Sequence, residues 1–184
     1  MKEKVIKKLT SLMFGEAFAL FMFAVLWVWY SRYFNWRTPY LTSLPTVFTF
    51  IILEFLLVQG SLYWYLKWRM LKKGQKENKL TSLQLFLFEK LKVINILLLL
   101  TGAGFYVFDG RGYPASYHWF FILLYGFTLL EYINYYYIRL SYQSPEEIKE
   151  FIRQKGFRKS ILAREISGYK AERRVRRSGK DYFL

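Results

Sequence analysis

Three acidic side chains interrupt long apolar stretches of this sequence, and they are the residues best suited to chemistry. Glu16, Glu54 and Glu131 each lie inside a different segment that is long enough to cross a bilayer. A carboxylate at membrane depth is costly, so it is usually paired, protonated or functional. Proton relay, cation binding and metal binding are the functional interpretations. The structural alternatives are a hydrogen bond to a neighbouring helix, or an ion pair with Lys90 or Arg139.

The glutamates fall at overlapping depths in their segments. Glu54 lies close to the middle of its span, whereas Glu131 and Glu16 lie about one turn or slightly more toward the cytoplasmic side. An amide in the third span falls near the depth of those two, and two polar side chains share a broad helical face with Glu131. The predicted intramembrane polar site therefore has six members, namely Glu16, Glu54, Asn95, Thr128, Glu131 and Tyr135.

Metal and nucleophile chemistry receive little support from the composition. The chain has no cysteine and a single histidine, His118. It also lacks the Glu-x-x-His pair that carboxylate sites in helix bundles use. We therefore expect no metal site and no cofactor. No phosphate-binding glycine loop, nucleophile elbow or zincin motif occurs, so a membrane enzyme is the weakest hypothesis.

Membrane helices must position the glutamates, because apolar and basic residues separate into long blocks. Of 184 residues, 54% are hydrophobic and 22% are charged, as expected for a chain with two solvents. Four apolar segments predict spans, over about 12–30, 44–64, 93–108 and 117–137. The third is short. It is preceded either by an interfacial helix over 82–90 or, alternatively, it belongs to one long tilted helix from Ser82.

Basic residues divide unevenly between the two sides of the membrane. Four spans place both termini on one side. That side carries four basic residues before the first span, eight between Lys67 and Lys92 and thirteen after the fourth span, so 25 of the 28. Short loops rich in lysine and arginine mark the cytoplasmic side. We predict an all-α integral membrane protein of the plasma membrane, with a four-transmembrane-helix bundle over 1–140 and both termini cytoplasmic.

Residues 141–184 form a basic, partly helical tail with too few apolar residues for a core of its own. Ser144, followed by a proline and two glutamates, predicts a helix start. A further helix is expected around Ile161 and Ile166. Four clustered arginines are candidates for contact with anionic lipid headgroups or a protein partner, and nucleic acid is the less favoured ligand. They are Arg173, Arg174, Arg176 and Arg177.

Small residues predict close helix contacts on two of the spans. Ser11, Gly15 and Ala19 follow one another at four-residue spacing in the first span, and Gly102 and Gly104 make the third span thin. Such residues let helix backbones approach each other. These faces could meet other helices of the chain or a second copy in a homo-oligomer.

Two functions of different classes follow from these features. The first is a membrane-embedded interaction or effector subunit, whose basic cytoplasmic surface binds anionic lipid or a protein partner. The second is a carboxylate-lined channel or transporter for protons or cations, which uses the intramembrane glutamates. The first is preferred because it requires nothing special of the glutamates.

Overall fold

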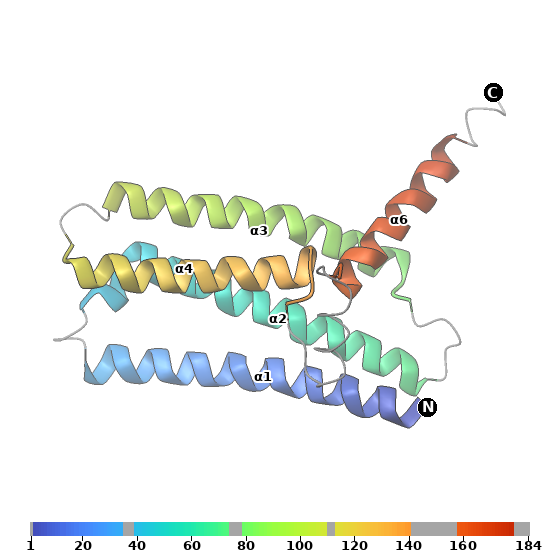
Figure 1. The fold of residues 1–184 in the computed structure, drawn as a ribbon, viewed down its shortest axis with the longest axis horizontal. Coiled ribbons are helices and arrows are strands. Elements are labelled where there is room, and N and C mark those ends of the chain that lie inside the picture. Colours follow the sequence, from blue (N-terminus) through green and yellow to red (C-terminus); the bar gives the residue numbers. More distant parts are fainter. Residues whose placement is uncertain (1, 35–38, 74–78, 110–112, 141–157, 179–184) are drawn as a thin grey trace. The chain divides into compact units, whose positions relative to one another are not determined.

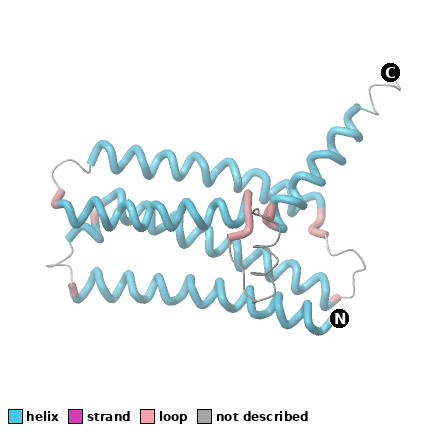
Figure 2. The backbone as a smooth tube through the Cα atoms, viewed as in Figure 1, coloured by secondary structure: helices cyan, strands magenta, loops and turns pink. Residues whose placement is uncertain are grey.

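The protein is helical throughout the part of the chain that its computed structural model describes, which is residues 2–34, 39–73, 79–109, 113–140 and 158–178 (Figures 1 and 2). No strand occurs within these ranges, which confirms the all-α class. The elements are α1 (Lys2–Tyr33), the short 3-10 helix η1 (Pro39–Thr42), α2 (Leu44–Lys72), α3 (Ser82–Asp109), α4 (Ala115–Tyr136) and α6 (Ile161–Ser178).

Three of these helices are long and apolar enough to cross a membrane, which indicates a membrane protein. They comprise Val5–Tyr33, Leu44–Lys72 and Ser82–Asp109. Residues 117–136 of the predicted fourth span lie in α4, a helix of 22 residues that is not among the three. Five tyrosines and Glu131 lower the mean hydropathy of α4, because hydroxyl and carboxyl groups favour water over hydrocarbon.

The third predicted span is part of one continuous helix. α3 starts at Ser82, so the structure has the long helix of the second alternative and no break between an interfacial helix and a short span. A capping box fixes this start: the Gln84 N–H donates to Thr81 Oγ1 at 3.4 Å, and the Thr81 N–H donates to Gln84 Oε1 at 3.0 Å. This reciprocal pair satisfies two backbone donors that a helix start leaves open.

The chain divides into two compact units. Unit 1 comprises Met1–Asn78 and Ile94–Glu131, and unit 2 comprises Lys79–Val93 and Tyr132–Leu184. Both α3 and α4 contribute residues to each unit. The predicted division at residue 140 follows hydropathy instead of contacts, and it stays a prediction.

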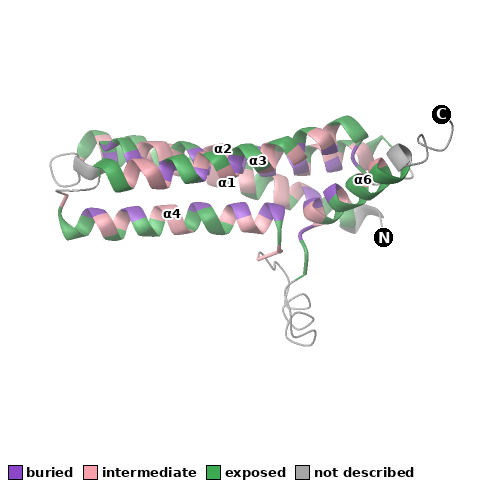
Figure 3. Ribbon diagram, turned by 90° about the horizontal axis from the view of Figure 1, so that it is seen from above, coloured by how far each residue is buried: buried purple, intermediate pink, exposed green. Residues whose placement is uncertain are grey.

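In unit 1, α2 is the central helix and α1 packs along it in the opposite direction (Figure 1). Half of the apolar window of α2 is buried inside the protein, whereas none of the α1 window is. The core of α2 includes Ile52, Leu53 and Leu56, which are at most 2% exposed. Buried and exposed residues alternate along the helices at helical spacing, as Figure 3 shows for α4.

Of the three glycines Gly15, Gly102 and Gly104, Gly102 alone lies against a neighbouring helix. A β-carbon on Gly102 would lie 3.5 Å from Phe48 Cδ1 and 3.5 Å from Thr49 Oγ1, so α3 approaches α2 closely at this point. A β-carbon on Gly15 or Gly104 would have no neighbour within 4 Å. The expectation that the first-span stripe packs on another helix of this chain therefore fails at Gly15, which is exposed among the described residues.

In unit 2, a short antiparallel bridge joins the end of α4 to the start of α6. Ile138 pairs with Lys159. Ser160 Oγ accepts a hydrogen bond from the Ala163 N–H at 3.0 Å and so caps α6, as serine commonly does at a helix start. The further tail helix expected around Ile161 is thus present as α6. The helix start expected at Ser144 lies outside the described residues.

Candidate functional site

The central helix α2 presents two opposite faces to its neighbours in unit 1. On one face, Phe50 stacks on Trp27 of α1, with ring centroids 4.1 Å apart and planes 15° apart. On the other, Gln59 hydrogen-bonds Asn95 of α3. Phe50 and Gln59 are nine residues apart, which is about 180° around a helix. The position of any polar residue on α2 relative to these two therefore decides which helix it faces.

Glu54 belongs to the face of α2 that meets α1. It follows Phe50 by four residues and lies about 40° from it around the helix, and Ser61 lies about 20° from it. Glu54 Oε1 is buried and accepts no hydrogen bond from any described residue. Ser61 Oγ and the donor Trp64 Nε1, on this side of α2, are also buried and have no hydrogen-bond partner among the described residues. Three polar atoms without described partners thus lie along one helix face.

Glu16 belongs to the face of α1 that meets α2. It precedes Trp27 by eleven residues, which is about 20° around the helix, and the buried Leu9 lies on the same face. Because α1 and α2 run in opposite directions from the Trp27–Phe50 stack, the position level with Glu16 on α2 is Ser61. Glu54 lies seven residues from Ser61, so it is separated from Glu16 by about 10 Å along the helix axes.

Glu131 belongs to the face of α4 that meets α1. Phe127 of α4 contacts Phe23 of α1 edge to face, with ring centroids 5.8 Å apart, and Phe120 lies 6.4 Å from Trp27. Glu131 follows Phe127 by four residues and shares its face. Since α4 runs opposite to α1, Glu131 lies within about one turn of the level of Glu16.

The intramembrane polar site of six residues stays a prediction, and its members face different neighbours. Glu16, Glu54 and Glu131 lie on helix faces directed toward the same interhelical space of unit 1, around α1. Asn95 lies on the opposite side of α2. Thr128 Oγ1 donates to the Leu124 carbonyl within its own helix at 2.7 Å, and Tyr135 is buried in unit 2.

The amide of Asn95 forms a closed pair with a residue that the sequence analysis missed. Asn95 Nδ2 donates to Gln59 Oε1 at 2.8 Å, and Gln59 Nε2 donates to Asn95 Oδ1 at 3.1 Å. Both side chains are buried, Asn95 completely. A glutamine in the middle of an apolar span was the available signal. This pair uses its polar groups on each other, so it links α2 to α3 and leaves little capacity for a ligand.

No described residues form a metal site. Among the histidines, aspartates and glutamates with described positions, no three come close enough together to hold an ion. The single histidine is used otherwise: His118 Nδ1 lies 2.8 Å from the Tyr106 hydroxyl of α3.

In unit 2, α6 is docked on the first turns of α3. Lys170 Nζ lies 3.2 Å from Glu89 Oε1, and the Arg173 guanidinium lies 5.9 Å from the centre of the Phe86 ring. Leu162 and Ile166 are buried in the same face of α6. Packing and charge together hold the helix in place.

The predicted arginine cluster stays a prediction, and the two of its side chains that the structure describes differ in exposure. Arg173 lies on the docked face of α6, whereas Arg174 is exposed. The side chains of Arg176 and Arg177 lie outside the described part of the structure. Other basic side chains of unit 2 are exposed, namely Lys79, Lys90, Arg158, Lys159, Arg164 and Lys170.

Comparison with known proteins gives no relative. No protein-family model, no curated protein and no solved structure matches this chain.

Proposed function

We propose that this protein is a membrane-embedded interaction subunit. Four helices anchor it, and unit 2 presents a basic cytoplasmic surface to anionic lipid headgroups or to an acidic protein partner. The docking of α6 on α3 is the observation that supports this function. A capped helix with an ion pair and a buried apolar face holds basic side chains at defined positions, which a positive-inside charge bias alone does not require.

Site-specific photo-crosslinking in cells tests this function. A photoreactive side chain at Arg174 should give a discrete adduct, and the same group at Leu123, an exposed apolar position of α4, should not. The adduct should disappear in the Lys90→Gln/Arg164→Gln variant, because the attraction is electrostatic. Glu172→Gln, an exposed acidic position on α6, should keep it. An adduct of equal yield in the wild type and in both of these charge variants would contradict the proposal.

The proposed layout has α4 as the fourth span and both termini in the cytoplasm. The partition of basic residues supports it. We expect a membrane-impermeant thiol reagent to label Ser116→Cys in intact cells and to label Ser167→Cys only after permeabilisation. Both serines are exposed, whereas Ser43, in the other external loop, is buried and would be a poor reporter. The native chain has no cysteine, so no background labelling arises. If the reagent labelled Ser167→Cys in intact cells and Ser116→Cys only after permeabilisation, the proposed orientation would be wrong.

The glutamates support a second candidate function, the conduction of protons or cations. The specific observation is that three carboxylates lie on faces directed toward one interhelical space and that Glu54 Oε1 has no described partner. Carboxylates at membrane depth commonly belong to ion or proton pathways.

Replacing Glu54 by glutamine tests this second function. The amide keeps the shape and hydrogen-bonding capacity of the carboxyl group but can neither carry a charge nor release a proton. We expect Glu54→Gln to keep wild-type expression and thermal stability and to abolish any proton or cation flux into proteoliposomes. Glu172→Gln is the matched control and should leave flux unchanged. No flux by the wild type under any proton or cation gradient would eliminate the conductor.

A further inference from the structure

The antiparallel bridge of unit 2 brings together basic residues that are far apart in the sequence. The Arg139 N–H donates to the Arg158 carbonyl at 2.8 Å, and the Ser160 N–H donates to the Tyr137 carbonyl at 3.0 Å. The Ser160 hydroxyl also donates to the Tyr135 carbonyl. Three hydrogen bonds therefore fix the segment before α6 against the segment after α4.

The pairing register sets two arginines directly opposite each other. Because Ile138 pairs with Lys159, the next pair along the two segments is Arg139 with Arg158. Directly opposite residues of an antiparallel pair have β-carbons about 5 Å apart on the same face, and like charges in that arrangement repel. The bridge thus places two arginines that are 19 residues apart in the sequence on the same face.

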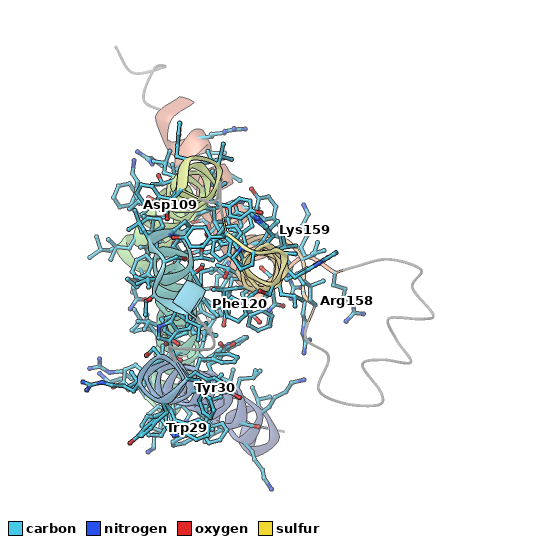
Figure 4. All side chains as sticks on the ribbon, turned by 90° about the vertical axis from the view of Figure 1, so that its left-hand side faces the viewer. Trp29, Tyr30, Asp109, Phe120, Arg158 and Lys159 are labelled. Atoms are coloured by element: carbon cyan, nitrogen blue, oxygen red, sulfur yellow. The ribbon has the colours of Figure 1, made fainter. Side chains whose placement is uncertain are left out.

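A further cation lies beside Tyr137, which precedes Arg139 by two residues and so shares its face. Arg158 is exposed, and Figure 4 shows its side chain extending outward. Lys92 of α3 donates to the Tyr136 carbonyl at 3.3 Å and lies 3.7 Å from the centre of the Tyr137 ring. We call Lys92, Tyr137, Arg139 and Arg158 the bridge corner.

The bridge corner has the composition of a headgroup site at a membrane surface. It directly follows the last residue of α4, in a run of three tyrosines, and tyrosines favour the level of the lipid headgroups. Arginine binds a phosphate oxygen pair through two parallel N–H donors, and lysine adds a point charge. Tyr137, which is 44% exposed, offers an apolar ring face to the glycerol and acyl region of the same molecule.

We propose that the bridge corner binds the phosphate of an anionic phospholipid, with Arg139 and Arg158 as the principal donors. The proposal rests on the proposed function, since it places unit 2 at the cytoplasmic membrane surface. It moves the lipid contact from the arginines of the C-terminal cluster to residues that only the bridge brings together.

Native mass spectrometry of the purified full-length protein tests the assignment. The probes are short-chain phosphatidylglycerol, short-chain phosphatidylcholine and inorganic phosphate. Arg139→Gln/Arg158→Gln should weaken phosphatidylglycerol binding at least about tenfold, since it removes two charge-assisted contacts. The matched variant Lys72→Gln/Lys73→Gln removes the same charge from exposed sites at the end of α2 and should weaken it less than about threefold.

Each outcome decides for or against the bridge corner. Equal losses in the two double variants would reduce the effect to diffuse charge and overturn the assignment. So would equal binding of phosphatidylcholine, or competition by inorganic phosphate at the same concentration as the lipid. If the Arg139/Arg158 variant melts at a lower temperature than the wild type, Arg158→Gln alone supplies the measurement, with a smaller loss expected. Because the protein is purified, the result does not depend on adduct formation in cells, so failure here and failure of the proposed function are distinguishable.

Discussion

Replacing Gly102 by leucine is expected to separate α3 from α2 and to unfold or severely destabilise unit 1. A β-carbon on Gly102 would already touch Phe48 Cδ1 and Thr49 Oγ1 at 3.5 Å and Ile52 Cδ1 at 3.6 Å. These are ordinary contact distances, so alanine fits, but the remaining three carbons of leucine have no space. Overpacking of this kind costs about 1–3 kcal/mol or more, and thermal unfolding in detergent measures the loss.

Gly104 provides the matched control on the same helix. A β-carbon there has no neighbour within 4 Å, so Gly104→Leu should melt at a temperature close to that of the wild type. Gly102→Ala should also melt near the wild type. If Gly102→Leu and Gly104→Leu had equal melting temperatures, the close approach of α3 to α2 at Gly102 would be wrong.

Replacing Asn95 by leucine is expected to give the second-largest loss of stability. The substitution removes both hydrogen bonds that the buried Gln59 amide forms with Asn95 and keeps the one from Gln59 Nε2 to the Phe55 carbonyl at 3.2 Å. An unsatisfied buried polar group costs about 1–3 kcal/mol, although its cost is lower where polar partners are also available in the unfolded state within the membrane. We expect a loss of about 1–2 kcal/mol in the free energy of unfolding.

A double-mutant cycle separates the pair from the individual residues. Gln59→Leu/Asn95→Leu removes both polar groups and should be more stable than Asn95→Leu alone, with a coupling energy of about 1 kcal/mol. Thr101→Val is the control, because Thr101 is exposed and its hydroxyl bonds the Leu97 carbonyl within its own helix. An Asn95→Leu variant as stable as Thr101→Val would show that the amide pair contributes nothing.

The helical class and the positions of the long apolar segments followed from the sequence. Runs of about 20 apolar residues have one low-energy backbone structure in hydrocarbon, because a helix satisfies its own hydrogen bonds. The extent of α3 did not follow. Hydropathy does not reveal a capping box. Two alternatives therefore stayed open from the sequence, namely a short span that begins at residue 93 and one long helix that starts at Ser82.

The depth of each glutamate was also readable from the sequence, since rise per residue is fixed. The neighbouring helix that each glutamate faces was not readable from the sequence. Helical spacing gives the angle between Glu131 and Thr128 on one helix, but it does not say which neighbour either residue meets. The ring contacts of Phe23, Trp27 and Phe50 supply that information, and they place Asn95 on the far side of α2 from the glutamates.

By itself, the sequence determined which segments favour hydrocarbon and which favour water, because hydropathy is a local property of the chain that does not depend on its fold. Only the tertiary structure decided which polar groups meet. Gln59 pairs with Asn95 across 36 residues, and Arg139 lies opposite Arg158 through the Ile138–Lys159 bridge. Such pairings depend on the register between elements, which is set by many side-chain contacts at once and leaves no trace at any single position.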